Sequence, residues 1–113
     1  MKKIEAIIKP SKLSNVKDAL HEIGLSGMTV SDVKGFGRQR GQDGGLNSSH
    51  DYDDEFRVKI KIELIIEDKI VEKALEAIKN AAYSGKIGDG KIFIYTIDQV
   101  IRIRTGEKDS DAV

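Results

Sequence analysis

The sequence predicts an α+β domain in which two helices cover one face of a four-stranded sheet. Apolar residues alternate in short segments and recur at helical spacing in two others. These segments follow one another as strand–helix–strand, long loop, strand–helix–strand, which is the order of a ferredoxin-like βαββαβ sandwich. Because two helices cover only one face of such a sheet, the other face meets solvent or another subunit, and we favour a subunit.

The first half of the chain contains a strand, a helix and a second strand. Residues 2–9 are rich in isoleucine and end at Pro10, and Ser11 can cap the helix that follows. Gly24 stands where helices commonly end, and residues 28–36 form the second strand. The helix has apolar residues at helical spacing, namely Leu13, Val16, Leu20 and Ile23.

A long polar segment separates the two halves. It begins at Gly37, is basic at Arg38 and Arg40, and becomes acidic before Phe56. Loops of more than about 12–15 residues without secondary structure are uncommon in compact domains unless they have a function or are disordered. We therefore expect an arm that the scaffold holds at both ends and that serves binding or signalling.

The second half repeats the pattern of the first. Residues 56–66 are expected to form a strand, and from Phe56 to Leu64 apolar and charged residues alternate, which indicates one buried face. Asp68 is expected to cap a second helix and Gly85 to end it, followed by a strand at 91–97. A further alternation runs from 100 to 104. The second helix has its apolar residues at Val71, Ala74, Leu75, Ile78 and Ala82.

Composition places the chain in a broad class. Its 113 residues predict a single domain, 1–113, with one core. Nineteen basic and 19 acidic residues balance, so the overall charge does not indicate a polyanionic partner. There is no cysteine for a disulfide or a thiolate metal site, and no apolar run reaches membrane-spanning length. We expect a cytoplasmic domain without membrane insertion.

The glycine-rich segment 85–91 has the G-x-x-x-x-G-K spacing of a Walker A loop, but it is not one. Ile92 stands where Ser or Thr would reach magnesium, and the segment leads from helix to strand. Its glycines and lysines could form a backbone amide nest for phosphate. Alternatively, Gly85 caps the helix and Asp89-Gly90 forms a tight turn. The segment alone leaves these two interpretations at even odds.

Arg102 and Arg104 alternate with isoleucines, which would place both guanidinium groups on one face of a strand. Paired arginines suit bidentate phosphate recognition, although two solvated arginines are the ordinary alternative. Lys59 is a possible third cation on the charged side of its strand.

An RNA-binding module on the same fold is disfavoured. Residues 34–37 match the opening of an RNP1 motif, but Arg38 and Gly41 stand where that motif has stacking aromatics. With six aromatic residues and no net charge, the chain offers little stacking surface for bases.

Four blocks of the sequence resemble the hallmark blocks of the PII signal-transduction proteins of nitrogen metabolism. They are MKKIEAIIKP, GMTVSDVKGFGRQRG, SGKIGDGKIF and VIRIRTGE, in the family's order. The resemblance implies a homotrimer that binds ATP or ADP in the clefts between subunits. It also implies a T-loop at about 37–55, a nucleotide-binding loop at 83–91 and a C-terminal segment at 99–113.

The resemblance also implies ligand contacts, residue by residue. Thr29 and the backbone near Glu63 and Ile65 would hold adenine. Lys59 would pair with a carboxylate of 2-oxoglutarate, and Gln39 would help to bind Mg²⁺ with ATP, which offsets the repulsion between a dicarboxylate and a triphosphate. The full set implied for the nucleotide is Thr29, Gly37, Arg38, Gln39, Glu63, Ile65, Gly88, Asp89, Gly90, Lys91, Arg102 and Arg104. The set implied for 2-oxoglutarate is Gln39, Arg40, Gly41 and Lys59.

The mechanism that the resemblance implies is a ligand-linked switch in the T-loop. Partners would be an ammonium transporter, glutamine synthetase or another enzyme of nitrogen assimilation. Tyr52 falls where many members carry a tyrosine that is modified by a nucleotidyl group, but its flanks here are acidic. The alternatives are a weak ATPase in the same cleft, with Glu63 as the base, and the RNA-binding module.

Overall fold

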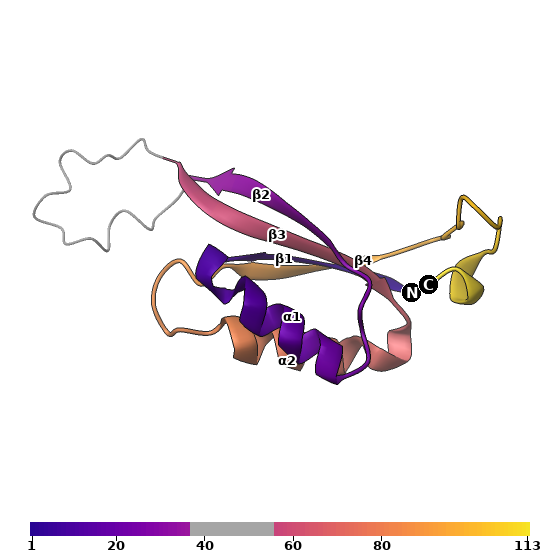
Figure 1. Cartoon of the computed structure of the whole chain (residues 1–113), viewed down its shortest axis with the longest axis horizontal. Helices are drawn as coiled ribbons and strands as arrows, with labels where there is room; N and C mark the ends of the chain where they lie inside the picture. Colours follow the sequence, from indigo (N-terminus) through magenta and orange to yellow (C-terminus); the bar gives the residue numbers. More distant parts are fainter. Residues whose placement is uncertain (37–55) are drawn as a thin grey trace, which may run out of the picture.

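The computed structural model describes residues 1–36 and 56–113 and has the predicted βαββαβ order (Figure 1). The four strands are β1 (Lys2–Ile8), β2 (Thr29–Gly35), β3 (Arg57–Ile66) and β4 (Lys91–Thr96). The two helices are α1 (Leu13–Glu22) and α2 (Val71–Ala82). Short 3₁₀ turns span Pro10–Lys12, Asp68–Ile70 and Asp109–Asp111. In the part of the chain that the structure describes, no helix is long and apolar enough to cross a membrane.

The strands form one antiparallel sheet in the order β2-β3-β1-β4. The register places Glu5 of β1 opposite Glu63 of β3 on one side and opposite Phe93 of β4 on the other. On the far side of β3, Thr29 of β2 faces Glu63. The strands β2 and β4 are therefore the two edges of the described sheet.

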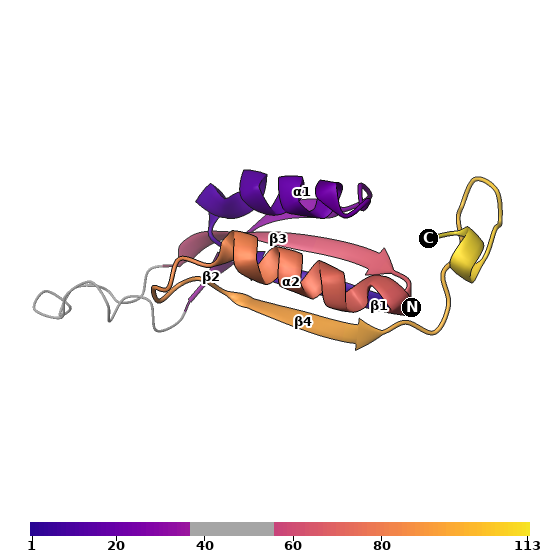
Figure 2. The same ribbon diagram turned by 90° about the horizontal axis from the view of Figure 1, so that it is seen from below.

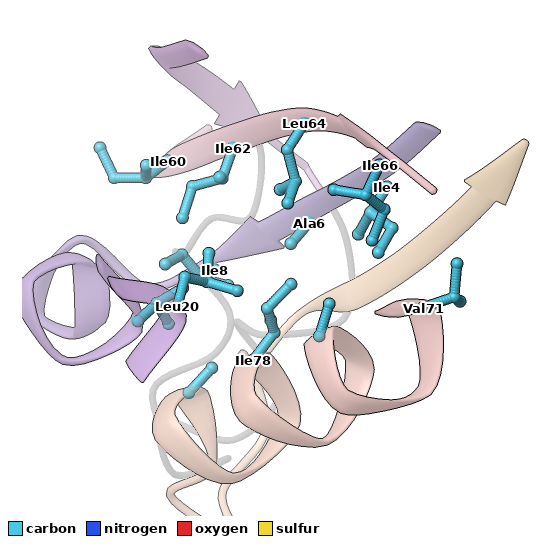
Figure 3. Packing of buried hydrophobic residues seen from close by; sticks show 13 residues of the cluster. Ile4, Ala6, Ile8, Leu20, Ile60, Ile62, Leu64, Ile66, Val71 and Ile78 are labelled. Carbon is cyan, nitrogen blue, oxygen red and sulfur yellow. The ribbon is translucent and has the colours of Figure 1, made fainter. Parts of the chain in front are cut away.

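Both helices pack on the same face of the sheet (Figures 1 and 2), as two helices must when a single core is to form. The alternating residues of β1 and β3 point into this core, and Ile4, Leu20, Ile62 and Ile78 have no exposed surface (Figure 3). The complete buried set is Ile4, Ala6, Ile8, Val16, Leu20, Ile60, Ile62, Leu64, Ile66, Val71, Ala74, Ile78 and Ala82.

The opposite face of the sheet is not covered by the described residues. On this face Lys3 Nζ lies 2.8 Å from a carboxylate oxygen of Glu63 and 5.3 Å from the centroid of the Tyr95 ring. Phe93 and Tyr95 of β4, which stand opposite Glu5 and Lys3, keep 43% and 45% of their surface exposed. Both helices lie on the other face, so among the described residues this face carries apolar as well as charged side chains without a covering element.

Two predicted helix caps are wrong. Before α1, Pro10 starts a 3₁₀ turn, and no side chain caps either that turn or the helix, so Ser11 is not a cap. Before α2, Asp68 begins another 3₁₀ turn and instead forms an ion pair of 2.8 Å with the amino group of Met1. In both places a 3₁₀ turn precedes the helix where a side-chain cap was expected.

One of the two predicted helix ends is confirmed, and the other is wrong. Gly24 follows α1 with φ of +91°, as expected for a glycine at a helix end. The helix α2 ends at Ala82, because Tyr83 is already extended, so Gly85 is part of the next loop and does not end the helix.

The alternating segment 100–104 is not a strand. Arg102 N donates to Glu107 O at 2.8 Å and Gly106 N donates to Arg102 O, so the chain turns back on itself with a single bridge between Ile101 and Lys108. This segment lies beyond the end of the sheet, where no described strand runs beside it (Figures 1 and 2). The expectation that Arg102 and Arg104 leave one face of a strand is therefore wrong.

Candidate ligand-binding site

A pocket of about 500 Å³ opens where β1 ends, β4 begins and the loop after α2 returns to the sheet. Its volume is within the range of small-molecule sites, roughly 300–1,000 Å³. Its lining combines glycines, lysines and two phenylalanines: Ile7, Gly35, Phe36, Arg57, Lys59, Lys86, Ile87, Gly88, Asp89, Gly90, Lys91 and Phe93.

Lys59 is the buried cation of this pocket. The residue keeps 9% of its surface exposed, and its Nζ donates a hydrogen bond of 2.7 Å to the carbonyl oxygen of Gly88. Burial lowers the pKa of Lys59, and the neighbouring charges of Lys9 and Arg57 act in the same direction, whereas Asp89 opposes them. Among the described residues no carboxylate forms an ion pair with Lys59. A ligand carboxylate or phosphate would supply the missing negative charge.

Asp89 organises the loop between α2 and β4. Its carboxylate accepts hydrogen bonds from the amides of Ser84 and Gly85, at 2.8 and 2.9 Å, and from the Ser84 hydroxyl. It also forms an ion pair of 3.3 Å with Lys9. Burial alone would raise the pKa of Asp89, but the bonds from Ser84, Gly85 and Lys9 outweigh it and hold this pKa well below its usual value.

Asp89→Asn is expected to lower the free energy of unfolding at pH 7 by about 1 kcal/mol, because charge-assisted hydrogen bonds are lost. The folded-state pKa of Asp89 lies below its ordinary value of 3.8. The ionised carboxylate of Asp89 therefore adds to the free energy of unfolding above about pH 4, and this stabilisation is lost as the pH falls further. Urea titrations at fixed protein concentration should show a difference between wild type and variant at pH 7 that shrinks below pH 4. A difference that stayed constant from pH 7 to pH 2.5 would contradict this account.

The glycines of the loop are required by its backbone. Gly85, Gly88 and Gly90 have φ of +84°, +101° and +95°, a region that other residues rarely adopt. At Gly90 a Cβ atom would lie 1.7 Å from the carbonyl oxygen of Ile7, so the loop is pressed against β1. Backbone conformation thus accounts for all three glycines, including Gly88, which has no role in the interpretation as a helix cap and a turn.

One chain brings together only part of the predicted site. Gly88, Asp89, Gly90, Lys91 and Lys59 all line the pocket. These residues lie together at one end of the sheet, where the loop after α2 leads into β4.

The predicted adenine and arginine contacts lie elsewhere in the same chain. Thr29 sits opposite Glu63, four residues along β3 from Lys59, a separation of roughly 13 Å, and Ile65 is further still. Arg102 and Arg104 lie in the segment beyond the opposite end of the sheet (Figures 1 and 2). A single copy therefore cannot present all of these residues to one nucleotide.

The two arginines also differ in their surroundings. Arg102 donates to Ala112 O at 3.3 Å and approaches Glu107 at 3.8 Å. Arg104 is exposed and has no side-chain partner within residues 1–36 and 56–113. Arg104 is thus the more available cation.

Glu63 does not have the environment of a general base. Its carboxylate is held by Lys3 at 2.8 Å, and the hydrogen bond from Lys3 lowers the pKa of Glu63, although partial burial opposes the shift. A carboxylate stabilised in this way is a weaker proton acceptor. This environment does not support the alternative of a weak ATPase.

Several predicted contacts lie outside the described residues. They are Gly37, Arg38, Gln39, Arg40, Gly41 and Tyr52. Their roles remain predictions from the sequence.

The sequence reasoning missed Lys9 and Ser84. Lys9 Nζ donates to Ser84 Oγ at 3.0 Å, across 75 positions of the chain. Serine beside glycine is a turn signal that could have singled out Ser84. No sequence pattern singled out Lys9, which was the last residue of the predicted strand 2–9.

The fold and the pocket define the class of protein: a small ferredoxin-like domain with a glycine-rich, lysine-lined pocket of small-molecule size. The family model described as nitrogen regulatory protein P-II matches residues 1–107. The chain is 61% identical to the nitrogen regulatory protein P-II of Rhodospirillum rubrum and 57% identical to that of Azospirillum brasilense. It is 52% identical to nitrogen regulatory protein P-II 1 of Escherichia coli, and all three alignments cover the whole of both chains.

A solved structure gives the same result. The crystal structure of Arabidopsis thaliana PII bound to citrate superposes with a TM-score of 0.81 at 39% identity, covering 99% of this chain and 91% of that one. The chain belongs to the nitrogen regulatory protein P-II family. It is a nitrogen-regulatory signal protein of a non-enzymatic family that binds small-molecule effectors, which confirms the predicted fold, family and class of function.

Proposed function

We propose that the protein senses ATP or ADP together with Mg²⁺ and 2-oxoglutarate, and that segment 37–55 reports the bound state to a partner. The partner is an ammonium transporter or an enzyme of nitrogen assimilation such as glutamine synthetase, met in the cytoplasm. The observation that carries the proposal is the pocket beside Lys59, in which a buried ammonium group and a glycine-rich loop offer positive charge and backbone amides to an anion.

The nucleotide is proposed to bind between copies of the chain in a homotrimer. Support comes from the separation of the two groups of contacts, since the phosphate loop and the pair Thr29–Glu63 are far apart in one copy. A second copy brings Thr29 or Arg104 to the pocket of the first. The uncovered sheet face, with Phe93 and Tyr95 on it, offers apolar surface for such an association. Light scattering after gel filtration should give three times the 12.5 kDa of one chain, and a monomer that still binds ATP would contradict the shared site.

Arg104→Ala is expected to weaken ATP binding roughly 10- to 100-fold, as loss of charge-assisted hydrogen bonds to phosphate predicts. Calorimetric titration of ATP measures the change. Lys108→Ala is the matched control, because it removes one exposed positive charge from the same segment and should change affinity less than about twofold. Unchanged affinity in Arg104→Ala would remove this residue from the site.

Lys59→Met is expected to abolish 2-oxoglutarate binding in the presence of MgATP and, because it also removes the hydrogen bond to Gly88 O, to weaken ATP binding to a smaller extent. The physical reason is that the buried ammonium group is the pocket's charge partner for a carboxylate. Lys61→Met is the control, since Lys61 lies two residues further along β3 and outside the pocket lining. Titration of 2-oxoglutarate with and without MgATP tests both variants, and full binding by Lys59→Met would contradict the assignment.

A further inference from the structure

The loop between α2 and β4 contains a hydrogen-bonded cluster that joins it to the end of β1. The cluster consists of Lys9, Ser84 and Asp89. The Ser84 hydroxyl donates to the Asp89 carboxylate and accepts from the amide of Lys86 at 3.3 Å and from Lys9 Nζ at 3.0 Å. A hydroxyl has one donor and two acceptor sites, so all of its hydrogen-bonding capacity is in use.

The cluster divides the amides of the loop into two groups. The amides of Ser84 and Gly85 donate to Asp89, and that of Lys86 donates to Ser84. The following amides, from Ile87 to Asp89, have no acceptor among the described residues. Three successive amides are therefore left for an outside acceptor, at the point where the loop lines the pocket.

Lys59, which lies on β3 and outside the cluster, orients the amide of Asp89. Its bond to the carbonyl of Gly88 fixes the direction of the Gly88–Asp89 peptide. In a planar trans peptide the N–H points opposite to the C=O, so the amide of Asp89 is directed away from Lys59. The loop is thus held at two places, by Lys59 at Gly88 and by the cluster at residues 84–86.

We propose that Lys9, Ser84 and Asp89 are positioning residues that preform the loop for phosphate, and that the Asp89 carboxylate itself does not contact the ligand. The proposal rests on the proposed nucleotide site and gives Asp89 a different role from a phosphate contact. Its carboxylate oxygens are already occupied by Ser84, Gly85 and Lys9, and a bare carboxylate beside a triphosphate would repel it. Lys9 compensates the charge of Asp89, so the loop presents its free amides without an unpaired anion beside them.

The experiment compares ATP affinity in Ser84→Ala and Ser84→Thr by calorimetry, with EDTA present so that Mg²⁺ takes no part. Ser84→Ala removes the hydroxyl and should weaken ATP binding about tenfold, whereas Ser84→Thr keeps it and should stay within about twofold of wild type. Lys9→Met, with Lys9→Arg as its matched control, removes the hydrogen bond to Ser84 and the ion pair with Asp89, and should weaken ATP binding in the same direction. Equal affinity in Ser84→Ala and Ser84→Thr would overturn the proposal.

Asp89→Asn separates positioning from direct contact. If the carboxylate only positions the loop, this variant should bind ATP more weakly in EDTA; if the carboxylate faced the phosphates, removing its charge would strengthen binding and overturn the proposal. Hydrogen exchange of the amides of residues 84–86 gives a readout without ligand, and Ser84→Ala should exchange them at least tenfold faster than Ser84→Thr. Wild-type protein that fails to bind ATP would refute the nucleotide proposal, whereas unchanged exchange would refute the cluster.

Discussion

Gly90→Ala is expected to destabilise the protein by roughly 3 kcal/mol or more and to abolish nucleotide binding. The added Cβ would lie 1.7 Å from the carbonyl oxygen of Ile7 and 2.8 Å from its carbonyl carbon, both of which are backbone atoms in a paired strand. The φ of +95° adds strain of roughly 1–2 kcal/mol for a residue with a side chain. Neither the backbone of β1 nor that of the loop at Gly90 can shift without a large energetic cost. The loop must therefore leave its position against the sheet.

The matched control for Gly90→Ala is Gly27→Ala. Gly27 has no positive φ, and a Cβ built there meets nothing within 4 Å, so this variant should change stability by less than about 0.5 kcal/mol. Urea unfolding at one protein concentration gives the free energies, and ATP titration gives the binding. Equal stability of the two variants would show that the loop does not press on β1 as described.

Ile62→Ala is expected to lower the free energy of unfolding by about 2–5 kcal/mol. Ile62 is fully buried in the centre of β3, between the sheet and both helices (Figure 3). Removing its outer carbons leaves a cavity that the close-packed core closes only in part. The loss is a large fraction of the stability of a domain of this size.

Ile103→Ala makes the same chemical change at a residue that is 99% exposed. It should change the free energy of unfolding by less than about 0.5 kcal/mol when the chain is monomeric. A larger loss in Ile103→Ala at high protein concentration than at low concentration would show that another copy covers this side chain. A loss below 1 kcal/mol in Ile62→Ala would contradict the core as described.

The fold could be predicted because the apolar pattern of each main element is strong. Alternation along β3 continues from Arg57 to Leu64, and a shift by one would turn Ile60 and Ile62 away from the helices. Alternation did not indicate a strand at 100–104, because no described strand runs beside that segment. Alternation indicates which side chains share a face only when a sheet exists to define that face.

The candidate site was predictable where it depends on backbone conformation. Gly88 and Gly90 stood out in the sequence because few other residues adopt the φ that their loop needs. Lys9 and Ser84 did not stand out, because their contact joins residues 75 positions apart and depends on how β1 meets the loop. Asp68 was assigned to a helix cap for the same reason, since the sequence does not show that the amino terminus folds next to it.

The exposed edge strand β4 has a consequence for aggregation and handling. Its sequence KIFIYT has one charged residue and no proline, and it is rich in residues that favour strands. An uncovered edge of this kind can template pairing with other chains, and six residues suffice for a tightly packed fibrillar sheet. With a formal net charge of zero, the chain has little long-range repulsion to keep copies apart. Unless another copy of the chain covers it, this edge is therefore where precipitation or fibril formation should begin.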